Sequence, residues 1–227
     1  MRPFLSLVLL LTLATSFAPQ PARKKIVFFG DSITQAGVQP KGYITRLQAL
    51  LAEKGKGDQY ELLGAGIGGN KVYDLYLRVE DDVLSKNPDA VLIWVGVNDV
   101  WHKRTSGTGT DADKFERFYQ ALIKKFRDRN IQVFMATPAV IGEKTDFSNE
   151  LDGDLNRYSG IIRKVAKENN CTLVDLRKAF LDFNLKNNPE NKEQGILTTD
   201  RVHLNEAGNN LVADEILKAL TPGFFAK

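Results

Sequence analysis

Cysteine and histidine are both scarce in this sequence of 227 residues. Cys171 is the single cysteine, so the chain contains neither an intramolecular disulfide nor a cysteine-based zinc site. The two histidines, His102 and His203, are too few for a histidine-rich metal site, and we expect no metal and no organic cofactor. Any histidine chemistry must therefore use one of these two side chains.

Long basic runs are also lacking. The chain has 31 Lys and Arg against 28 Asp and Glu, a net charge of +3, and its longest basic run is Arg23, Lys24 and Lys25. This balance gives no indication of a nucleic-acid partner or an acidic membrane surface. Hydrophobic residues make up 43% and charged residues 26%, which is ordinary for a globular domain and excludes a disordered, collagen-like or disulfide-rich chain.

The one long hydrophobic run lies at the N-terminus, where a positively charged start precedes an apolar stretch over 4–14. Ser16 and Ala18 then provide the small residues of a cleavage site after Ala18, a pattern typical of a secretory signal peptide. The run is shorter than the roughly 20 residues that cross a bilayer, although a retained N-terminal anchor is the alternative. We expect a signal peptide over 1–18, a short N-terminal segment over 19–25, a secreted or periplasmic protein, and no stable membrane insertion.

Short apolar runs alternate with helical periodicity through the rest of the chain, with no linker between them. The runs are rich in Val, Ile and Phe and do not alternate with polar residues, which is typical of strands covered on both faces. Such alternation predicts one domain over 26–222, a three-layer α/β/α sandwich around a parallel sheet. The expected strands cover 26–29, 60–63, 90–95, 131–136 and 172–174.

Apolar residues at helical spacing predict four helices. Thr110 and Asp113 match a capping box before one of them, and Asn205 is the expected N-cap of the last. The helices are expected over 43–54, 115–126, 155–168 and after Asn205.

Candidate catalytic groups follow three predicted strands, at the sheet edge where such folds bind ligands. Ser32, within 30–34, begins the segment after the first strand, although Asp-Ser is also a common turn or helix cap. The glycine-rich run over 64–70 is either a tight loop or a source of backbone N–H groups for an oxyanion, and it lacks the Gly-Lys-Ser/Thr of a phosphate loop. Asn98 either caps a turn or donates its side-chain N–H to an oxyanion.

A further candidate pair lies near the C-terminus. Asp200 and His203 are three residues apart, so on a turn the carboxylate can hold Nδ1–H while Nε2 accepts a hydroxyl proton. A histidine there is otherwise a capping or surface residue. His102 is the rival base but lacks an equally placed carboxylate. It follows Trp101 in an expected loop over 101–110, so both side chains are expected to line a substrate pocket.

Four blocks of the sequence, in this order, resemble those of the SGNH (GDSL) hydrolase superfamily. The resemblance implies a flavodoxin-like, five-stranded sheet of order 2-1-3-4-5. It implies Ser32 as nucleophile, His203 as base and Asp200 as acid. It also implies an oxyanion hole formed by the N–H groups of Ser32 and Gly69 and by the Asn98 amide. The four blocks are Gly30-Asp31-Ser32-Ile33-Thr34, Gly66-Ile67-Gly68-Gly69, Gly96-Val97-Asn98-Asp99 and Asp200-x-x-His203.

The expected function is that of a secreted serine esterase that works through an acyl-enzyme. Acetyl esters on carbohydrate are the leading substrates, and no nucleic-acid partner is expected. The enzymatic alternative is a lysophospholipase or thioesterase, and the alternative from another class is a catalytically silent carbohydrate-binding protein. Asp31, Asp99, Trp101 and His102 are the expected substrate contacts.

Overall fold

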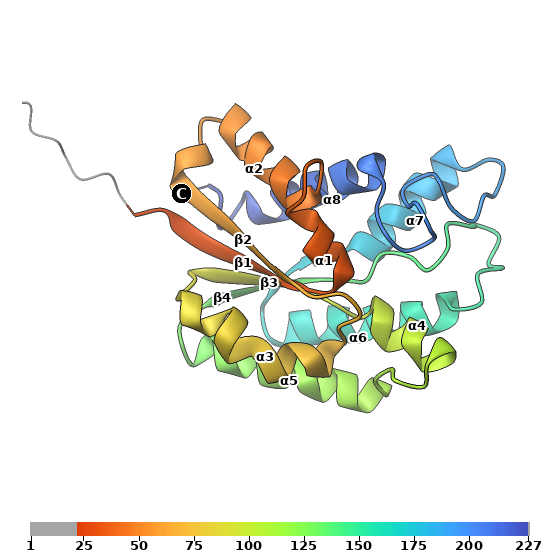
Figure 1. Cartoon of the computed structure of the whole chain (residues 1–227), viewed down its shortest axis with the longest axis horizontal. Coiled ribbons are helices and arrows are strands. Elements are labelled where there is room, and N and C mark those ends of the chain that lie inside the picture. Colours follow the sequence, from red (N-terminus) through yellow and green to blue (C-terminus); the bar gives the residue numbers. More distant parts are fainter. Residues whose placement is uncertain (1–21, 227) are drawn as a thin grey trace, which may run out of the picture.

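A computed structural model describes residues 22–226 of the chain. The expected signal peptide over 1–18 lies outside the described residues. The described chain forms a three-layer sandwich, with helices packed on both faces of one sheet (Figure 1). This arrangement confirms the predicted fold class.

The sheet has five parallel strands in the order β2-β1-β3-β4-β5, as the family resemblance implied. Gly30 at the end of β1 pairs with Gly66 of β2 on one side and with Trp94 of β3 on the other, so these three strands end at the same level. The strands are β1 (Lys24–Gly30), β2 (Tyr60–Gly66), β3 (Ala90–Trp94), β4 (Gln132–Ala136) and β5 (Thr172–Val174).

Two groups of helices cover the two faces of the sheet (Figure 1). No helix within residues 22–226 is long and apolar enough to span a membrane. One face carries α1 (Ser32–Gly37), α2 (Tyr43–Glu53), α7 (Leu176–Asn187) and α8 (Glu206–Leu220). The other carries α3 (Val72–Asp82), α4 (Val97–Thr105), α5 (Ala112–Arg127) and α6 (Asp152–Glu168), and two short 3-10 helices are η1 (Gly57–Gln59) and η2 (Leu84–Lys86).

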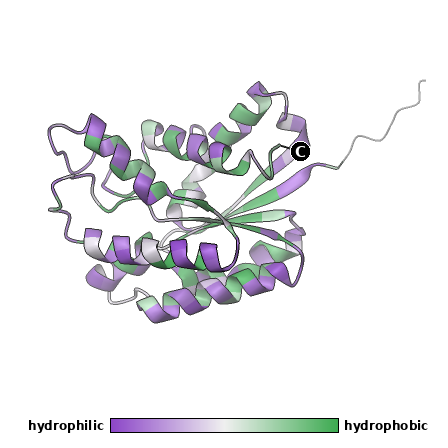
Figure 2. Ribbon diagram, turned by 180° about the vertical axis from the view of Figure 1, so that it is seen from behind, coloured by the Kyte–Doolittle hydropathy of each residue, from purple (hydrophilic) through white to green (hydrophobic). Residues whose placement is uncertain are grey.

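The central strands β1, β3 and β4 are buried on both sides because alternate side chains enter opposite helix layers, whereas the edge strands β2 and β5 are partly exposed. Phe28 of β1 packs against Tyr43 of α2, with ring centroids 5.8 Å apart, whereas the ring of the next residue, Phe29, lies against Arg78 of α3. Figure 2 shows hydrophobic residues along the strands and on the inner helix faces. This double burial is the physical reason for the unbroken apolar runs in the sequence.

Of the two helix caps predicted from the sequence, one is confirmed and the other is wrong. The side chain of Asn205 accepts from the N–H of Gly208 and caps α8, as predicted. The capping box of Thr110 and Asp113 is wrong, because α5 begins at Ala112 and its N-cap is Asp111, whose side chain makes no cap hydrogen bond.

The expected loop over 101–110 is wrong in its first half, since α4 continues to Thr105 and places Trp101 and His102 on a helix, whereas residues 106–110 form a loop as predicted. Helix α4 starts directly after β3, from Gly96 with a φ of 136°. Its buried residues are confined to its first turn, so no long apolar stripe marked it in the sequence.

The domain extends beyond its predicted bounds of 26–222 at both ends. Strand β1 starts at Lys24, within the segment that we expected to precede the domain. Phe224 and Phe225, beyond the predicted end, are buried against Tyr60, and the hydroxyl of Tyr60 donates to the carbonyl of Phe224.

Candidate active site

Ser32 lies where β1 gives way to α1. The carboxylate of Asp31 caps this helix by accepting from the N–H of Ile33 at 3.0 Å. Because Ser32 is the first residue of α1, its own N–H has no acceptor four residues earlier in the helix. Asp31 is buried, which differs from the prediction that it contacts substrate.

Ser32 and His203 lie far apart in the sequence but are in contact in the fold. Ser32 Oγ lies 3.0 Å from His203 Nε2, and His203 Nδ1 lies 2.7 Å from Asp200 Oδ2. Because a carboxylate only accepts hydrogen bonds, the proton of the neutral imidazole is on Nδ1 and Nε2 accepts from the serine hydroxyl. The predicted nucleophile, base and acid are therefore connected in one line.

A tight turn holds the acid and the base in this arrangement. Asp200 Oδ1 accepts from the backbone N–H groups of His203 at 2.8 Å and Val202 at 3.2 Å, and Arg201 between them has a left-handed φ of 81°. Burial alone would raise the pKa of Asp200, but the hydrogen bonds from the side chain and backbone of His203 hold that pKa below its usual value. Asp200 is therefore ionised wherever the imidazole needs it as an acceptor.

The loop after β2 lies against α1 and beside Ser32. A Cβ at Gly66 would lie 2.1 Å from the backbone nitrogen of Gln35, so only glycine allows this approach. A Cβ at Gly68 would lie 4.0 Å from that of Ser32. Gly69 follows with a φ of 75°, and its N–H has no acceptor among the described residues. This N–H is available to an oxyanion.

Asn98 lies in the first turn of α4 and is almost completely buried. Its Nδ2 donates to the carbonyl of Asn70, next to Gly69, at 3.1 Å. A primary amide carries two N–H bonds, so this contact orients the amide and leaves the second N–H for another acceptor.

Asp99 connects α4 to α3 instead of facing a ligand. Its side chain is completely buried, Oδ1 accepts from the N–H of Val72 at 3.1 Å, and Oδ2 has no partner among the described residues. The prediction that Asp99 contacts substrate is wrong, because none of it reaches the surface. Burial raises the pKa of Asp99 to about 7 and that of Asp31 to about 6.

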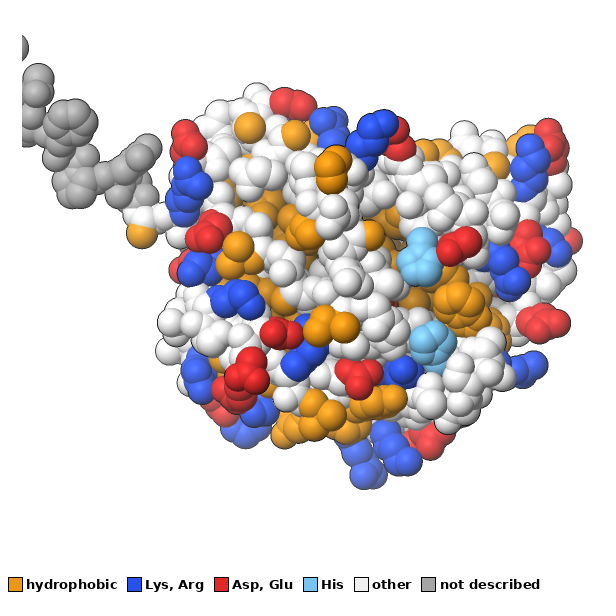
Figure 3. All heavy atoms as spheres, viewed as in Figure 1, with side chains coloured by type: hydrophobic (Ala, Val, Ile, Leu, Met, Phe, Trp, Pro, Cys, Tyr) orange, Lys and Arg blue, Asp and Glu red, His pale blue; other side chains and the backbone are white. Residues whose placement is uncertain are grey.

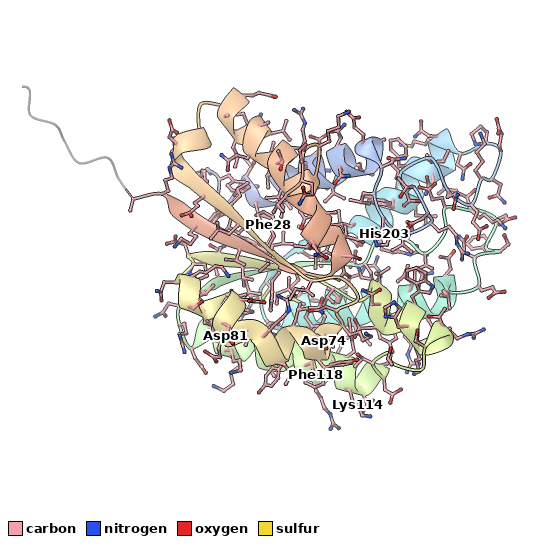
Figure 4. All side chains as sticks on the ribbon, in the orientation of Figure 1. Phe28, Asp74, Asp81, Lys114, Phe118 and His203 are labelled. Atoms are coloured by element: carbon pink, nitrogen blue, oxygen red, sulfur yellow. The ribbon has the colours of Figure 1, made fainter. Side chains whose placement is uncertain are left out.

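His102 lies beside the glycine-rich loop, and the ring of Trp101 lies against that of His102. A Cβ at Gly69 would lie 3.8 Å from His102 Cε1, and the rings of Trp101 and His102 are 5.7 Å apart. Burial lowers the pKa of His102, and the charge of Lys71 lowers it further. Figure 3 shows both histidines on one face of the molecule, and Figure 4 places His203 beyond the strand ends.

Two polar residues that support this loop were not predicted from the sequence. Lys71 donates to the carbonyl of Gly69 at 2.8 Å, while Arg78 donates to Oδ1 of Asn70 at 2.7 Å. The buried positions of α3 are Val72, Leu75 and Val79, so recognising that helix would have placed Arg78 beside a buried stripe. Within residues 22–226, no three His, Cys, Asp or Glu side chains gather in a way that could hold a metal ion.

Comparisons with known proteins agree with this geometry. The model of the GDSL-like lipase/acylhydrolase family matches residues 28–211. A solved acetyl xylan esterase, AlAXEase, is 69% identical and superposes with a TM-score of 0.85 over 86% of this chain and 99% of its own. An acetylxylan esterase of Geobacillus stearothermophilus is 28% identical over 87% of this chain and 94% of that protein. A GDSL esterase/lipase of Oryza sativa, WDL1, is 27% identical over 90% of this chain and 80% of that protein.

Proposed function

The chain belongs to the GDSL-like lipase/acylhydrolase family and is a carboxylic ester hydrolase, and we propose that Ser32, His203 and Asp200 are its catalytic triad. The observation that carries this assignment is the 3.0 Å contact of Ser32 Oγ with His203 Nε2, continued by the 2.7 Å contact of Nδ1 with Asp200. This line of contacts provides a nucleophile, a proton acceptor and a group that orients the acceptor.

In the first half of the reaction, Oγ of Ser32 attacks the ester carbonyl carbon as its proton passes to Nε2 of His203. The negative charge on the carbonyl oxygen is stabilised by the N–H groups of Ser32 and Gly69 and by the amide of Asn98. Collapse of this intermediate breaks the bond to the alcohol oxygen, which takes the proton from Nε2. The products are a free hydroxyl on the alcohol and an acyl group on Ser32.

In the second half, a water molecule attacks the acyl carbon and gives a proton to His203. The same N–H groups stabilise the second oxyanion. Its collapse releases the carboxylic acid and returns the proton to Oγ of Ser32. Throughout, Asp200 holds the imidazole in the orientation that both proton transfers need, and neither half of the cycle requires a cofactor.

We propose acetyl esters on xylan or xylooligosaccharides as the substrates. Support comes from the 69% identity to an acetyl xylan esterase and from the similarity to the acetylxylan esterase of Geobacillus stearothermophilus. His102, beside Gly69, and Trp101, whose ring contacts that of His102, are the proposed substrate contacts. We further propose that the protein is exported after loss of residues 1–18.

The triad is tested by Ser32→Ala. Acetate release from acetylated xylan and from p-nitrophenyl acetate should be abolished, because no other group replaces the attacking oxygen. Asn98→Ala should lower kcat by about 10²–10³-fold through loss of one oxyanion donor. Ser85→Ala is the matched control, since this exposed serine of η2 lies at the amino end of β3. Full activity of the Ser32→Ala protein would contradict the assignment.

A substrate panel tests the acetyl-carbohydrate preference. Acetylated xylooligosaccharides should have a higher kcat/KM than lysophospholipid or acyl-CoA. The reverse order would favour the lysophospholipase or thioesterase alternative. Labelling of Ser32 by a fluorophosphonate probe should occur in the wild type, and its absence would favour a catalytically silent carbohydrate-binding protein.

A further inference from the structure

Arg78 of α3 reaches from the helix layer to the strand ends that carry the proposed active site. Its side chain is only 14% exposed. Nη2 donates to the carbonyl of Gly30 at 2.7 Å and to that of Ala65 at 3.1 Å, and Nε donates to Oδ1 of Asn70 at 2.7 Å. One guanidinium therefore joins the ends of β1 and β2 to the loop that follows β2.

Two of these acceptors belong to the chain segments that lead to the proposed backbone donors of the oxyanion hole. The Gly30 carbonyl belongs to the last residue of β1, two residues before Ser32. The Ala65 carbonyl lies near the end of β2, four residues before Gly69. Bonding both carbonyls from one nitrogen adds a side-chain link to the backbone pairing of the two chain segments that present these N–H groups.

The third acceptor of Arg78 is the side chain of Asn70, a residue that also contacts Asn98, the proposed side-chain donor of the oxyanion hole. Arg78 orients the side chain of Asn70, and the backbone carbonyl of Asn70 accepts from Nδ2 of Asn98 at 3.1 Å. The position of the Asn98 amide thus depends on a residue that Arg78 holds. Arg78 contacts the support of each of the three proposed donors and contacts none of the donors itself.

The guanidinium is itself held from two further sides. Its central carbon lies 4.6 Å from the centroid of the Phe29 ring, and Nη1 donates to Asp82 at 2.5 Å. A planar fork of five N–H bonds can satisfy several acceptors in fixed directions, whereas a lysine ammonium presents a flexible point charge. Arginine is therefore the side chain that this set of acceptors selects.

We propose that Arg78 is a positioning residue of the oxyanion hole, which sets the spacing of the Ser32 and Gly69 segments and, through Asn70, the orientation of the Asn98 amide. The inference rests on the proposed function and extends it to a residue outside the four sequence blocks. Oxyanion donors act by preorganisation, so a small displacement of their supports is expressed in the rate of the chemical step.

Arg78→Lys tests this role, with p-nitrophenyl acetate as substrate and a temperature well below the Tm of every variant. We expect kcat to fall on the order of 10–100-fold, with little change in KM. In an Asn98→Ala background, Arg78→Lys should lower kcat by a clearly smaller factor, because one of the donors that it positions is already absent. A merely structural role would lower Tm and leave the two factors equal.

Arg117→Lys is the matched control, because it makes the same substitution at an exposed arginine of α5 that has no place in the proposed oxyanion hole. This variant should retain the wild-type kcat. Wild-type kcat in Arg78→Lys, or an equal loss with and without Asn98, would overturn the proposal.

Asn70→Ala keeps the proposal testable if Arg78→Lys does not fold. It removes the acceptor of Arg78 Nε while the contacts to both strands remain, and kcat should fall several-fold at a nearly unchanged Tm. An unchanged kcat would overturn the proposal. Ser32→Ala separates failure of the proposed function from failure of the positioning role, since an active Ser32→Ala protein contradicts the proposed function itself. An inactive Ser32→Ala protein beside a fully active Arg78→Lys protein contradicts only the positioning role.

Discussion

At the scale of single residues, two carboxyl groups next to the proposed oxyanion donors are buried. Asp31 precedes Ser32 and caps α1, and Asp99 follows Asn98 and bonds the first N–H of α3. Burial is the largest cause that raises the pKa of both, to about 6 for Asp31 and about 7 for Asp99. These carboxyl groups connect elements behind the site, and their protonation bears on stability.

The raised pKa of Asp99 makes the free energy of unfolding depend on pH, because the folded and unfolded states bind different numbers of protons. In the unfolded chain its pKa is about 4, whereas in the folded protein it is about 7, so between these values the folded state holds more protons. The free energy of unfolding contributed by this group is fully present below about pH 4 and is lost as the pH rises through 7. Above that pH the folded protein must keep an ionised carboxylate away from water.

Asp99→Asn should therefore stabilise the protein more at high pH than at low pH. We expect the difference in unfolding free energy from wild type to shift in favour of the variant by roughly 2 kcal/mol between pH 5 and pH 8. Urea unfolding at the two pH values measures this. Exposed Asp214→Asn is the control, and a pH-independent difference would contradict the assignment.

At the scale of elements, the segment over 188–205 carries the acid and the base without a helix or strand of its own. Glu143, in the loop after β4, is 1% exposed and accepts from the N–H groups of Ile196 at 2.8 Å and Leu197 at 2.6 Å. Thr198 then forms a bridge with Leu204, which closes the turn around Asp200 and His203. A buried carboxylate thus anchors the start of the catalytic turn.

Glu143→Gln should weaken this anchor, because an amide offers one acceptor oxygen and turns a donor toward the other N–H. We expect a loss of about 1.5–3 kcal/mol in unfolding free energy, the scale of hydrogen bonds to a charged group, and a lower kcat as the turn loosens. Thermal unfolding and acetate release measure the two effects. Glu190→Gln, with a side chain that is 70% exposed, should leave both unchanged. A fully stable and active Glu143→Gln protein would contradict this account.

At the scale of the whole molecule, the two ends of the described chain differ in their contribution to the core. Strand β1 begins at Lys24, five residues after the expected cleavage site. At the other end, Phe224 and Phe225 are almost completely buried beside Tyr60. The C-terminal residues belong to the folded unit even though they follow the last helix.

Shortened chains should reveal this difference. A protein that starts at Pro19 should keep the Tm and the activity of the full chain, and N-terminal sequencing of exported protein should begin at Pro19. A protein that ends at Pro222 should lose at least about 3 kcal/mol of unfolding free energy, because it removes two buried aromatic side chains. Denaturant unfolding compares the three chains. Equal stability of the chain that ends at Pro222 would contradict the packing.

Much of the fold could be predicted from local patterns. Short apolar runs marked all five strands, most clearly the central strands β1 and β3, where both sheet faces are covered, and Asn205 marked the start of α8. Helices α1, α3, α4 and α7 were not predicted, and the buried residues of α4 lie within a single turn. The burial of Asp31 and Asp99 was not predictable, since it depends on helices that pack from distant parts of the chain.

The fold class, the family and the positions of the candidate nucleophile, base, acid and oxyanion donors all follow from the order of residues along the chain. Strand composition and block order are local properties, and the carboxyl ends of parallel strands meet at one edge. The packed fold was needed to show which imidazole nitrogen faces Ser32 and which carboxylates are buried. It alone showed that Arg78 connects the two strand ends to Asn70. These features are distances between residues far apart in the chain, and packing of the helix layers on the sheet sets them.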